Sequence, residues 1–233
     1  MGYIPIFFDV TGRECAVVGG GEVAARKVES LLEAGAHVRV VSPRLSPPLE
    51  AIVARGLVTH IARDYERGDI RGCVLVHAAT DDPKLHRELA AEARALGIPI
   101  NVVDVPELCT FIAPAVVKRG ALQIAISTAG ASPAFAARLK SALEDQFGTE
   151  YAVTLEVLRA ARRRLHADEI DPADRMRRLK DLANSALPET IASGDLAAIE
   201  RILVTHLGHG VGLARLGIDS AALGLTRATE VPE

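Results

Sequence analysis

The sequence predicts an α/β protein with a doubly wound parallel sheet, a small β-hairpin and helix region, and an all-helical C-terminal domain. Apolar, strand-like runs alternate with segments of helical period up to about residue 112. Two short apolar runs joined by Lys-Arg-Gly then break the alternation, and only helical patterns follow. We therefore expect three domains, at residues 1–113, 114–149 and 150–233.

The first unit of the chain has a glycine-rich turn between a strand and a helix. Cys15–Val18 is wholly apolar, three glycines follow, and the period then becomes helical. The pattern Gly19-x-Gly21-x-x-Ala24 is a dinucleotide-binding fingerprint with Ala at the third small position. Glycines let the backbone approach a pyrophosphate, which the positive end of the helix attracts. This predicts a Rossmann-like nucleotide-binding domain; an ordinary tight turn is the alternative.

The rest of the first domain continues the alternation. Tyr3–Phe8 is at best an edge strand or a lead-in, since Pro5 interrupts it. Right-handed crossovers bring the carboxyl ends of parallel strands to one edge, so Thr80 and Asp104 are expected beside the glycines. The expected strands are 37–41, 58–62, 73–79 and 99–103, and the expected helices are 46–56, which Ser46 begins, and 80–97, with a polar loop at 64–71.

The C-terminal half of the sequence no longer alternates between strands and helices. A hairpin is expected from Pro114–Val117 and residues 121–127, and Ser132 begins the next helix. The helices after residue 151 are expected to break at residues 168–172, 188 and 193–194. The apolar face of the helix after the hairpin is Phe135, Leu139, Leu143 and Phe147.

Composition and charge exclude several classes of protein. Hydrophobic residues make up 49% and aromatic residues 3%, without Trp, which predicts an aliphatic core. The net charge of −3 argues against a nucleic-acid partner. No apolar run approaches the roughly 20 residues of a membrane span, and the N-terminus has no basic leader. We expect a cytoplasmic protein whose three cysteines are free thiols.

Residues at the ends of two strands are candidates for cofactor binding and proton transfer. Ser42-Pro43-Arg44 stands where an acidic residue usually binds ribose. Ser42 could bind a ribose and Arg44 a 2′-phosphate, so NADP stays open, as does a solvated loop. Asp104 could take a proton from substrate or serve only as a turn residue. Asn101 could orient a cofactor amide or ribose.

Several collinear segments resemble the precorrin-2 dehydrogenase / sirohydrochlorin ferrochelatase family, which also forms the N-terminal half of bacterial sirohaem synthases. They span residues 4–140 and are specific as a set. They are Ile4-Pro-Ile-Phe, Val18-Gly-Gly-Gly-Glu-Val-Ala-Ala-Arg-Lys27, Leu32-Glu-Ala-Gly-Ala36, Ala78-Ala-Thr-Asp-Asp82, Asn101-Val-Val-Asp104, Phe111-Ile-x-Pro114 and Ile126-Ser-Thr-Ala-Gly-x-Ser-Pro133.

The resemblance implies NAD-dependent oxidation of precorrin-2 to sirohydrochlorin, with Asp104 matching the family's essential aspartate, proposed as a base. Some members also insert Fe²⁺. The hairpin and the following helix match a dimerisation region that exchanges strands, so a homodimer is expected. Thr128 stands where some members carry a serine that can be phosphorylated, so regulation by phosphate is not expected to carry over. The methyltransferase half of the fused enzymes is expected to be missing. Cofactor contacts are expected from Gly19, Gly21, Glu22, Val23, Ser42, Pro43, Arg44, Thr80 and Asn101.

Two other functions stay open. The first is an NAD-binding sensor without catalysis, although such modules normally carry an acidic residue after the second strand. The second is a chelatase that has lost oxidation. No resident metal is expected, because His206-x-x-His209 has no third ligand nearby. The arginine-rich helices after residue 150 could attract a polycarboxylate substrate or form a solvated face.

Overall fold

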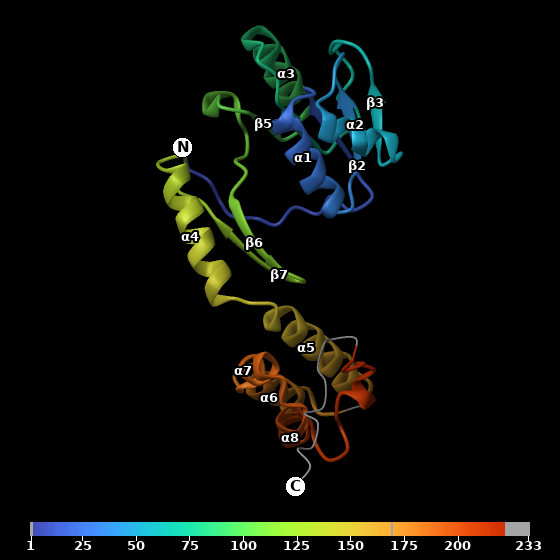
Figure 1. Cartoon of the computed structure of the whole chain (residues 1–233), viewed down its shortest axis with the longest axis vertical. Coiled ribbons are helices and arrows are strands. Elements are labelled where there is room, and N and C mark those ends of the chain that lie inside the picture. The colour runs from blue at the N-terminus through green and yellow to red at the C-terminus, as the bar shows by residue number, and fades with distance from the viewer. Residues whose placement is uncertain (1, 169, 222–233) are drawn as a thin grey trace. The chain divides into compact units, whose positions relative to one another are not determined.

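The computed structural model describes residues 2–168 and 170–221. The chain divides between Ala113 and Pro114 into two compact units, which are described separately. Unit 1 is an α/β unit, and unit 2 consists of a hairpin and helices (Figure 1). The predicted fold class is thereby confirmed.

Unit 1 contains a five-stranded, wholly parallel sheet in the order β3-β2-β1-β4-β5. The central strand β1 lies between β2 and β4, and its last residue, Val18, pairs with Val41 and Ala78. All carboxyl ends of these strands therefore meet at one edge, as predicted. The strands are β1 (Glu14–Val18), β2 (His37–Val41), β3 (Val58–Ile61), β4 (Leu75–Ala78) and β5 (Ile100–Val102).

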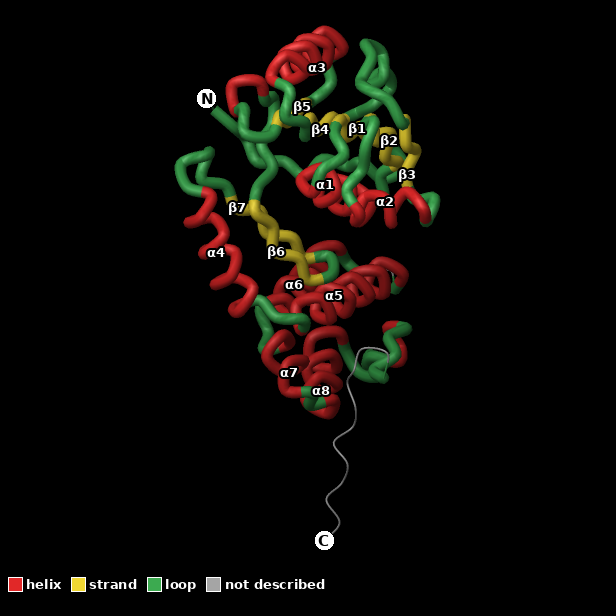
Figure 2. The backbone as a smooth tube through the Cα atoms, turned by 45° about the horizontal axis from the view of Figure 1, so that its top comes forward, coloured by secondary structure: helices red, strands yellow, loops and turns green. Residues whose placement is uncertain are grey.

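Helices cover both faces of this sheet. Figure 2 shows α1 (Glu22–Glu33) and α2 (Pro47–Ala54) on one face and α3 (Pro83–Leu96) on the other. Alternate residues of β1 enter the two cores, with Val17 on the side of α1 and Val18 on the side of α3. Because both faces are buried, the strands are continuous apolar runs rather than alternating ones.

The two later helices of unit 1 begin differently. Asp82 caps α3, since its carboxylate accepts hydrogen bonds from the amides of Lys84 (2.8 Å) and Leu85 (3.3 Å). Ser46 precedes α2 as predicted, but its side chain makes no cap hydrogen bond. Pro48 removes the amide at the second helical position, one of the two that a cap side chain can use.

Two predicted segments are shorter or absent. The strand expected at 73–79 begins only at Leu75, because the Cys73 amide donates to Ile70 in a turn. Tyr3–Phe8 forms no strand, and most of its apolar side chains are exposed.

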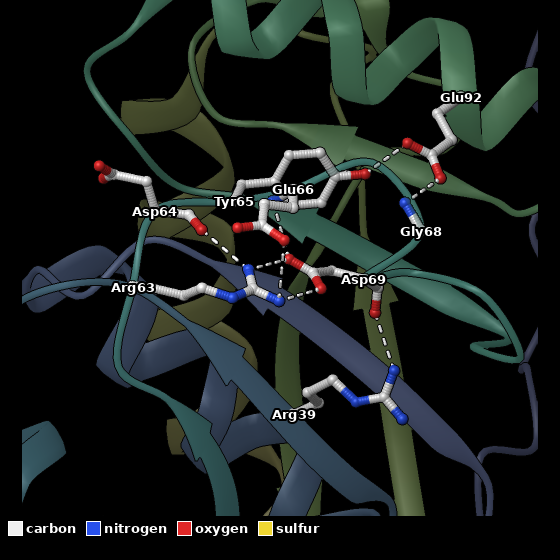
Figure 3. A network of polar contacts seen from close by, with 8 residues as sticks. All are labelled: Arg39, Arg63, Asp64, Tyr65, Glu66, Gly68, Asp69 and Glu92. Carbon is white, nitrogen blue, oxygen red and sulfur yellow. Dashed lines mark hydrogen bonds and ion pairs between the residues drawn. The ribbon is translucent and has the colours of Figure 1, made fainter.

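The polar loop between β3 and β4 is tied to the rest of unit 1 by a network of charged side chains (Figure 3). Arg63 donates two hydrogen bonds to the carboxylate of Asp69, at 2.7 and 2.8 Å, which lowers the pKa of Asp69. Arg39 on β2 donates to the Asp69 carbonyl at 2.8 Å. The hydroxyl of Tyr65 donates to buried Glu92 on α3 at 2.6 Å, and burial and this bond raise the Tyr65 pKa.

Unit 2 begins with an antiparallel hairpin of β6 (Ala115–Arg119) and β7 (Leu122–Ile126), on which α4 (Pro133–Gln146) packs. Ser132 caps α4 through the Phe135 amide at 3.2 Å. The predicted apolar face of α4 is only partly covered. Phe135 is 45% exposed, and Ala136 is the buried residue of this helix.

The remaining helices of unit 2 share a separate aliphatic core, which includes Val157, Leu165, Leu182 and Leu203. Pro188 lies in the first turn of its helix, where no amide is needed, so the predicted break at 188 falls just before residue 187 instead. No helix among the described residues is long and apolar enough to cross a membrane. These elements are α5 (Glu150–Ala167), α6 (Pro172–Ala183), α7 (Leu187–Ser193) and α8 (Leu196–Leu207), with short 3-10 helices η1 (Pro106–Leu108, in unit 1) and η2 (Ala214–Leu216).

Candidate functional site

Most of the predicted site residues of unit 1 lie in the loops that follow the strands at the carboxyl edge of the sheet. Glu22 and Val23 begin α1, and Asn101 lies in β5. The Gly19 amide donates to Val41 at 2.9 Å, and the Ala79 amide donates to Val18 at 2.8 Å. The Val103 amide donates to Ala78 at 2.9 Å. These backbone bonds continue the sheet past the strand ends, so the loops after β1, β2, β4 and β5 start side by side.

Each of the three glycines has a different environment. A β-carbon on Gly19, whose φ is +126°, would collide with the Ala79 carbonyl. A β-carbon on Gly20 would collide with the Arg44 carbonyl and lie 2.6 Å from the Ser42 hydroxyl. Nothing lies within 4 Å of such a position on Gly21. The first two glycines therefore allow close packing of neighbouring loops, and the third leaves open space.

That open space lies at the N-terminus of α1. Gly21 occupies the cap position in an extended conformation and supplies no side chain to the first-turn amides. Glu22 and Val23 are the first helical residues, and the helix dipole places partial positive charge there. Uncapped amides beside open space form the arrangement that a pyrophosphate occupies in dinucleotide-binding folds.

The loop after β2 is held against the glycine turn. The Ser46 amide donates to the Gly20 carbonyl at 2.7 Å. The buried hydroxyl of Ser42 donates to the Arg44 carbonyl at 2.7 Å, so Ser42 shapes this loop and could meet a ribose only as an acceptor. Pro43 and Arg44 are exposed. Their contact with a cofactor stays a prediction.

Thr80 and Asn101 already have partners within the chain. The Thr80 hydroxyl accepts the Asp82 amide at 3.4 Å. The Asn101 side-chain amide donates to the Phe111 carbonyl at 3.2 Å, so it holds the segment that follows the turn after β5. A role for either residue in binding the cofactor stays a prediction, which the Asn101 side-chain oxygen could still fulfil.

Asp104 follows β5 in a left-handed backbone conformation with a φ of +60°. Aspartate is among the few residues that tolerate this region. Its side chain is exposed, and its carboxylate makes no hydrogen bond or ion pair within residues 2–168 and 170–221. An unengaged carboxylate at the ligand-binding edge can accept a proton from a bound molecule.

A buried histidine lies just behind this edge. His77 on β4 pairs in register with Asn101, is 6% exposed, and its Nδ1 has no hydrogen-bond partner among the described residues. Its ring contacts Phe111 edge-on, with centroids 5.4 Å apart. Burial lowers the pKa of His77 to about 4, the positive charge of Lys27 adds to this, and Asn101 acts in the opposite direction. Burial also lowers the pKa of Lys27.

Two other features are a hollow in unit 1 and the histidine pair of unit 2. A hollow of about 510 Å³ lies where β4 and β5 begin and is lined by Arg71, Gly72, Cys73, Leu96 and Ile98. Within the described residues no group of three or more histidine, cysteine, aspartate or glutamate side chains could hold a metal. His206 lies in α8, and His209 lies in the turn after it.

Comparison with known proteins shows which proteins this chain is similar to. A model described as "Putative NAD(P)-binding" matches residues 6–115, and one described as "Sirohaem biosynthesis protein central" matches residues 119–146. A "Siroheme synthase" of Pseudomonas aeruginosa (strain LESB58) is 40% identical over 213 residues, which are 91% of this chain and 45% of that protein. One of Methylobacillus flagellatus is 47% identical over 148 residues, 64% of this chain and 32% of that protein. The chain is therefore similar to siroheme synthases over most of its own length.

These matches confirm the predicted resemblance. They also confirm the prediction that the cofactor is a nicotinamide adenine dinucleotide. The chain spans about half the length of the curated siroheme synthases that it matches. A solved structure named "SirC, precorrin-2 dehydrogenase" has the same fold, with a TM-score of 0.67 and 24% identity over 82% of this chain and 94% of that one.

The structure adds residues that the sequence analysis did not single out. Gly20 makes the closest approach to the second loop, although the fingerprint counts only the first and third glycines. The Cys109 thiol makes hydrogen bonds with the backbone of Val102 and Val105, on either side of Asp104. His77 is a single polar residue in an apolar strand, and no sequence pattern indicates what surrounds its side chain. Gly20 alone had a signal, since its neighbours are glycines.

Proposed function

We propose that this chain binds NAD at the carboxyl edge of the sheet of unit 1 and oxidises precorrin-2 to sirohydrochlorin. The uncapped N-terminus of α1, facing the open space at Gly21, would hold the pyrophosphate. The siroheme synthase relatives and the name of the solved precorrin-2 dehydrogenase support this substrate. NAD rather than NADP is chosen on family likeness.

The observation that carries the proposal is the unengaged carboxylate of Asp104 on the edge where the glycine turn also lies. Oxidation removes two electrons and two protons from the substrate. One proton leaves with both electrons as hydride to the nicotinamide, giving NADH. Asp104 accepts the other proton as a general base, and bulk water then takes it from the carboxyl group.

The test follows NADH absorbance after mixing protein, NAD and precorrin-2. Asp104→Asn keeps the shape of the side chain but removes the base, so NAD binding should persist while kcat falls about 100-fold or more. Asp64→Asn is the matched control, since Asp64 is an exposed carboxylate in the polar loop. Full turnover by Asp104→Asn would remove Asp104 from the mechanism. A flat trace from the wild-type protein with intact NAD binding would favour a sensor.

Fe²⁺ insertion is the second reaction to test, because a base beside a bound tetrapyrrole would serve both steps. Sirohydrochlorin supplied with Fe²⁺ or Co²⁺, without NAD, isolates this reaction. Metal insertion together with a flat NADH trace from precorrin-2 would identify a chelatase that does not oxidise. The metal would enter as substrate.

A homodimer is part of the proposal. The hairpin of β6 and β7 has only two strands, so both of its edges carry unpaired backbone groups. Val116, Ile124 and Ile126 on it are only partly buried. A second copy of this chain that extends the hairpin would pair its free edge and bury more of this apolar surface. Sedimentation analysis should give a dimer at micromolar concentration, and a monomer throughout would contradict this part.

A further inference from the structure

The thiol of Cys109 bonds to the backbone on both sides of Asp104. Its Sγ lies 3.2 Å from the Val102 carbonyl and 3.4 Å from the Val105 carbonyl, which share the single thiol proton. The same sulfur accepts the Val102 amide at 3.1 Å. One side chain thus connects the residues that flank the Val103–Asp104 turn.

This turn needs such support. Asp104 has a φ of +60°, a conformation that persists only where the surroundings enforce it. The backbone bond that closes the turn is a long one, because the Val105 amide donates to the Val102 carbonyl at 3.3 Å.

The position of Cys109 is itself secured by its neighbours. The Thr110 amide donates to the Ile100 carbonyl at 2.8 Å, and the Thr110 hydroxyl accepts the Ile100 amide at 2.8 Å. The Asn101 side-chain amide lies 3.6 Å from the Cys109 sulfur. The segment after the turn is therefore attached alongside β5, and its sulfur lies against the backbone that leads into Asp104.

We propose that Cys109 is a positioning residue for Asp104, whose thiol holds residues 102–105 in the conformation that presents the carboxylate at the carboxyl edge of the sheet. The role in catalysis rests on the proposed function. The hydrogen bonds of its thiol join the backbone of Val102 and Val105, on either side of Asp104, so its effect on the reaction passes through Asp104.

The first test compares Cys109→Ala, Cys109→Ser and Cys73→Ala. Cys109→Ala should lower kcat about 10- to 100-fold, the loss expected when a catalytic group is misplaced by up to about 1 Å. The affinity for NAD should stay unchanged. Cys109→Ser should recover much of kcat, because a hydroxyl also donates and accepts. Cys73→Ala removes a buried thiol at the opposite edge of the sheet and should leave kcat unchanged. An unchanged kcat in Cys109→Ala would overturn the proposal, whatever its stability.

The second test is a double-mutant cycle with Asp104→Asn. If Cys109 acts through Asp104, Cys109→Ala should cost little further activity once the carboxylate is gone. Losses that multiply in the double variant would show that the two residues act independently and would overturn the proposal.

A third measurement does not depend on activity. Cys109→Ala should accelerate hydrogen exchange at the Val102 amide, which donates to the sulfur in the wild-type protein. Unchanged exchange there would overturn the proposal. Wild-type protein that forms no NADH from precorrin-2 would refute the proposed function instead, and the exchange result would still decide whether Cys109 holds the turn.

Discussion

Replacement of His77 by leucine should flatten the pH dependence of the stability of unit 1. Burial, with the charge of Lys27, lowers the pKa of His77 from 6.5 to about 4. The unfolded chain therefore binds a proton more readily than the folded chain between these values. Stability is full above about pH 6.5 and is lost as the pH falls toward 4.

The size of the effect follows from the difference between the two pKa values. A shift of one pKa unit corresponds to about 1.4 kcal/mol, so a drop from 6.5 to about 4 is worth about 3 kcal/mol at full protonation. Because His77 is only 6% exposed, screening by solvent reduces this free-energy difference very little. His77→Leu removes the titrating group and also the Nδ1 atom that has no partner.

Native-state hydrogen exchange at the Val76 amide measures the opening free energy of unit 1 separately from that of unit 2. This amide donates to Pro99 at 2.9 Å within the core of the sheet. From pH 6.5 to 4.5 the wild-type opening free energy should fall by about 2–3 kcal/mol more than that of His77→Leu. His37→Leu, with an exposed side chain, should keep the wild-type slope. Equal slopes in wild-type and His77→Leu protein would refute the reasoning.

The other predictions separate packing from ligand binding. Gly20→Ala forces a β-carbon into the Arg44 carbonyl and should destabilise unit 1 by about 1–3 kcal/mol, as seen by urea unfolding. Gly21→Ala meets open space and should change stability by less than about 1 kcal/mol while weakening NAD binding in calorimetry, and unchanged affinity would contradict the cofactor position. Glu92→Ala leaves the buried Tyr65 hydroxyl without its acceptor and should cost about 2–3 kcal/mol, whereas exposed Glu88→Ala should cost under about 0.5 kcal/mol; equal costs would contradict the network.

The sequence alone determined the parts of this protein that depend on local chemistry. Apolar runs bounded by turn residues indicated each strand of unit 1, and the parallel order followed from the intervening helices. Asp82-Pro83 and Ser132-Pro133 marked helix starts correctly, because a cap acts within three residues. The glycine turn and the Asn101–Asp104 motif could also be recognised from the sequence, because each consists of residues that are adjacent in the chain.

The tertiary structure decided everything that depends on atoms from distant parts of the chain. Gly20 is required because a loop 24 residues later passes over it. Cys109 stands beside Val102 because Thr110 is attached to β5. The pKa of His77 is lowered because the ring is buried beside Phe111 and near the charge of Lys27. None of these partners is adjacent in sequence, and burial is a property of the folded surroundings. A residue's type thus indicated what chemistry it could do, while its folded neighbours decided which hydrogen bonds, space and charge it has available.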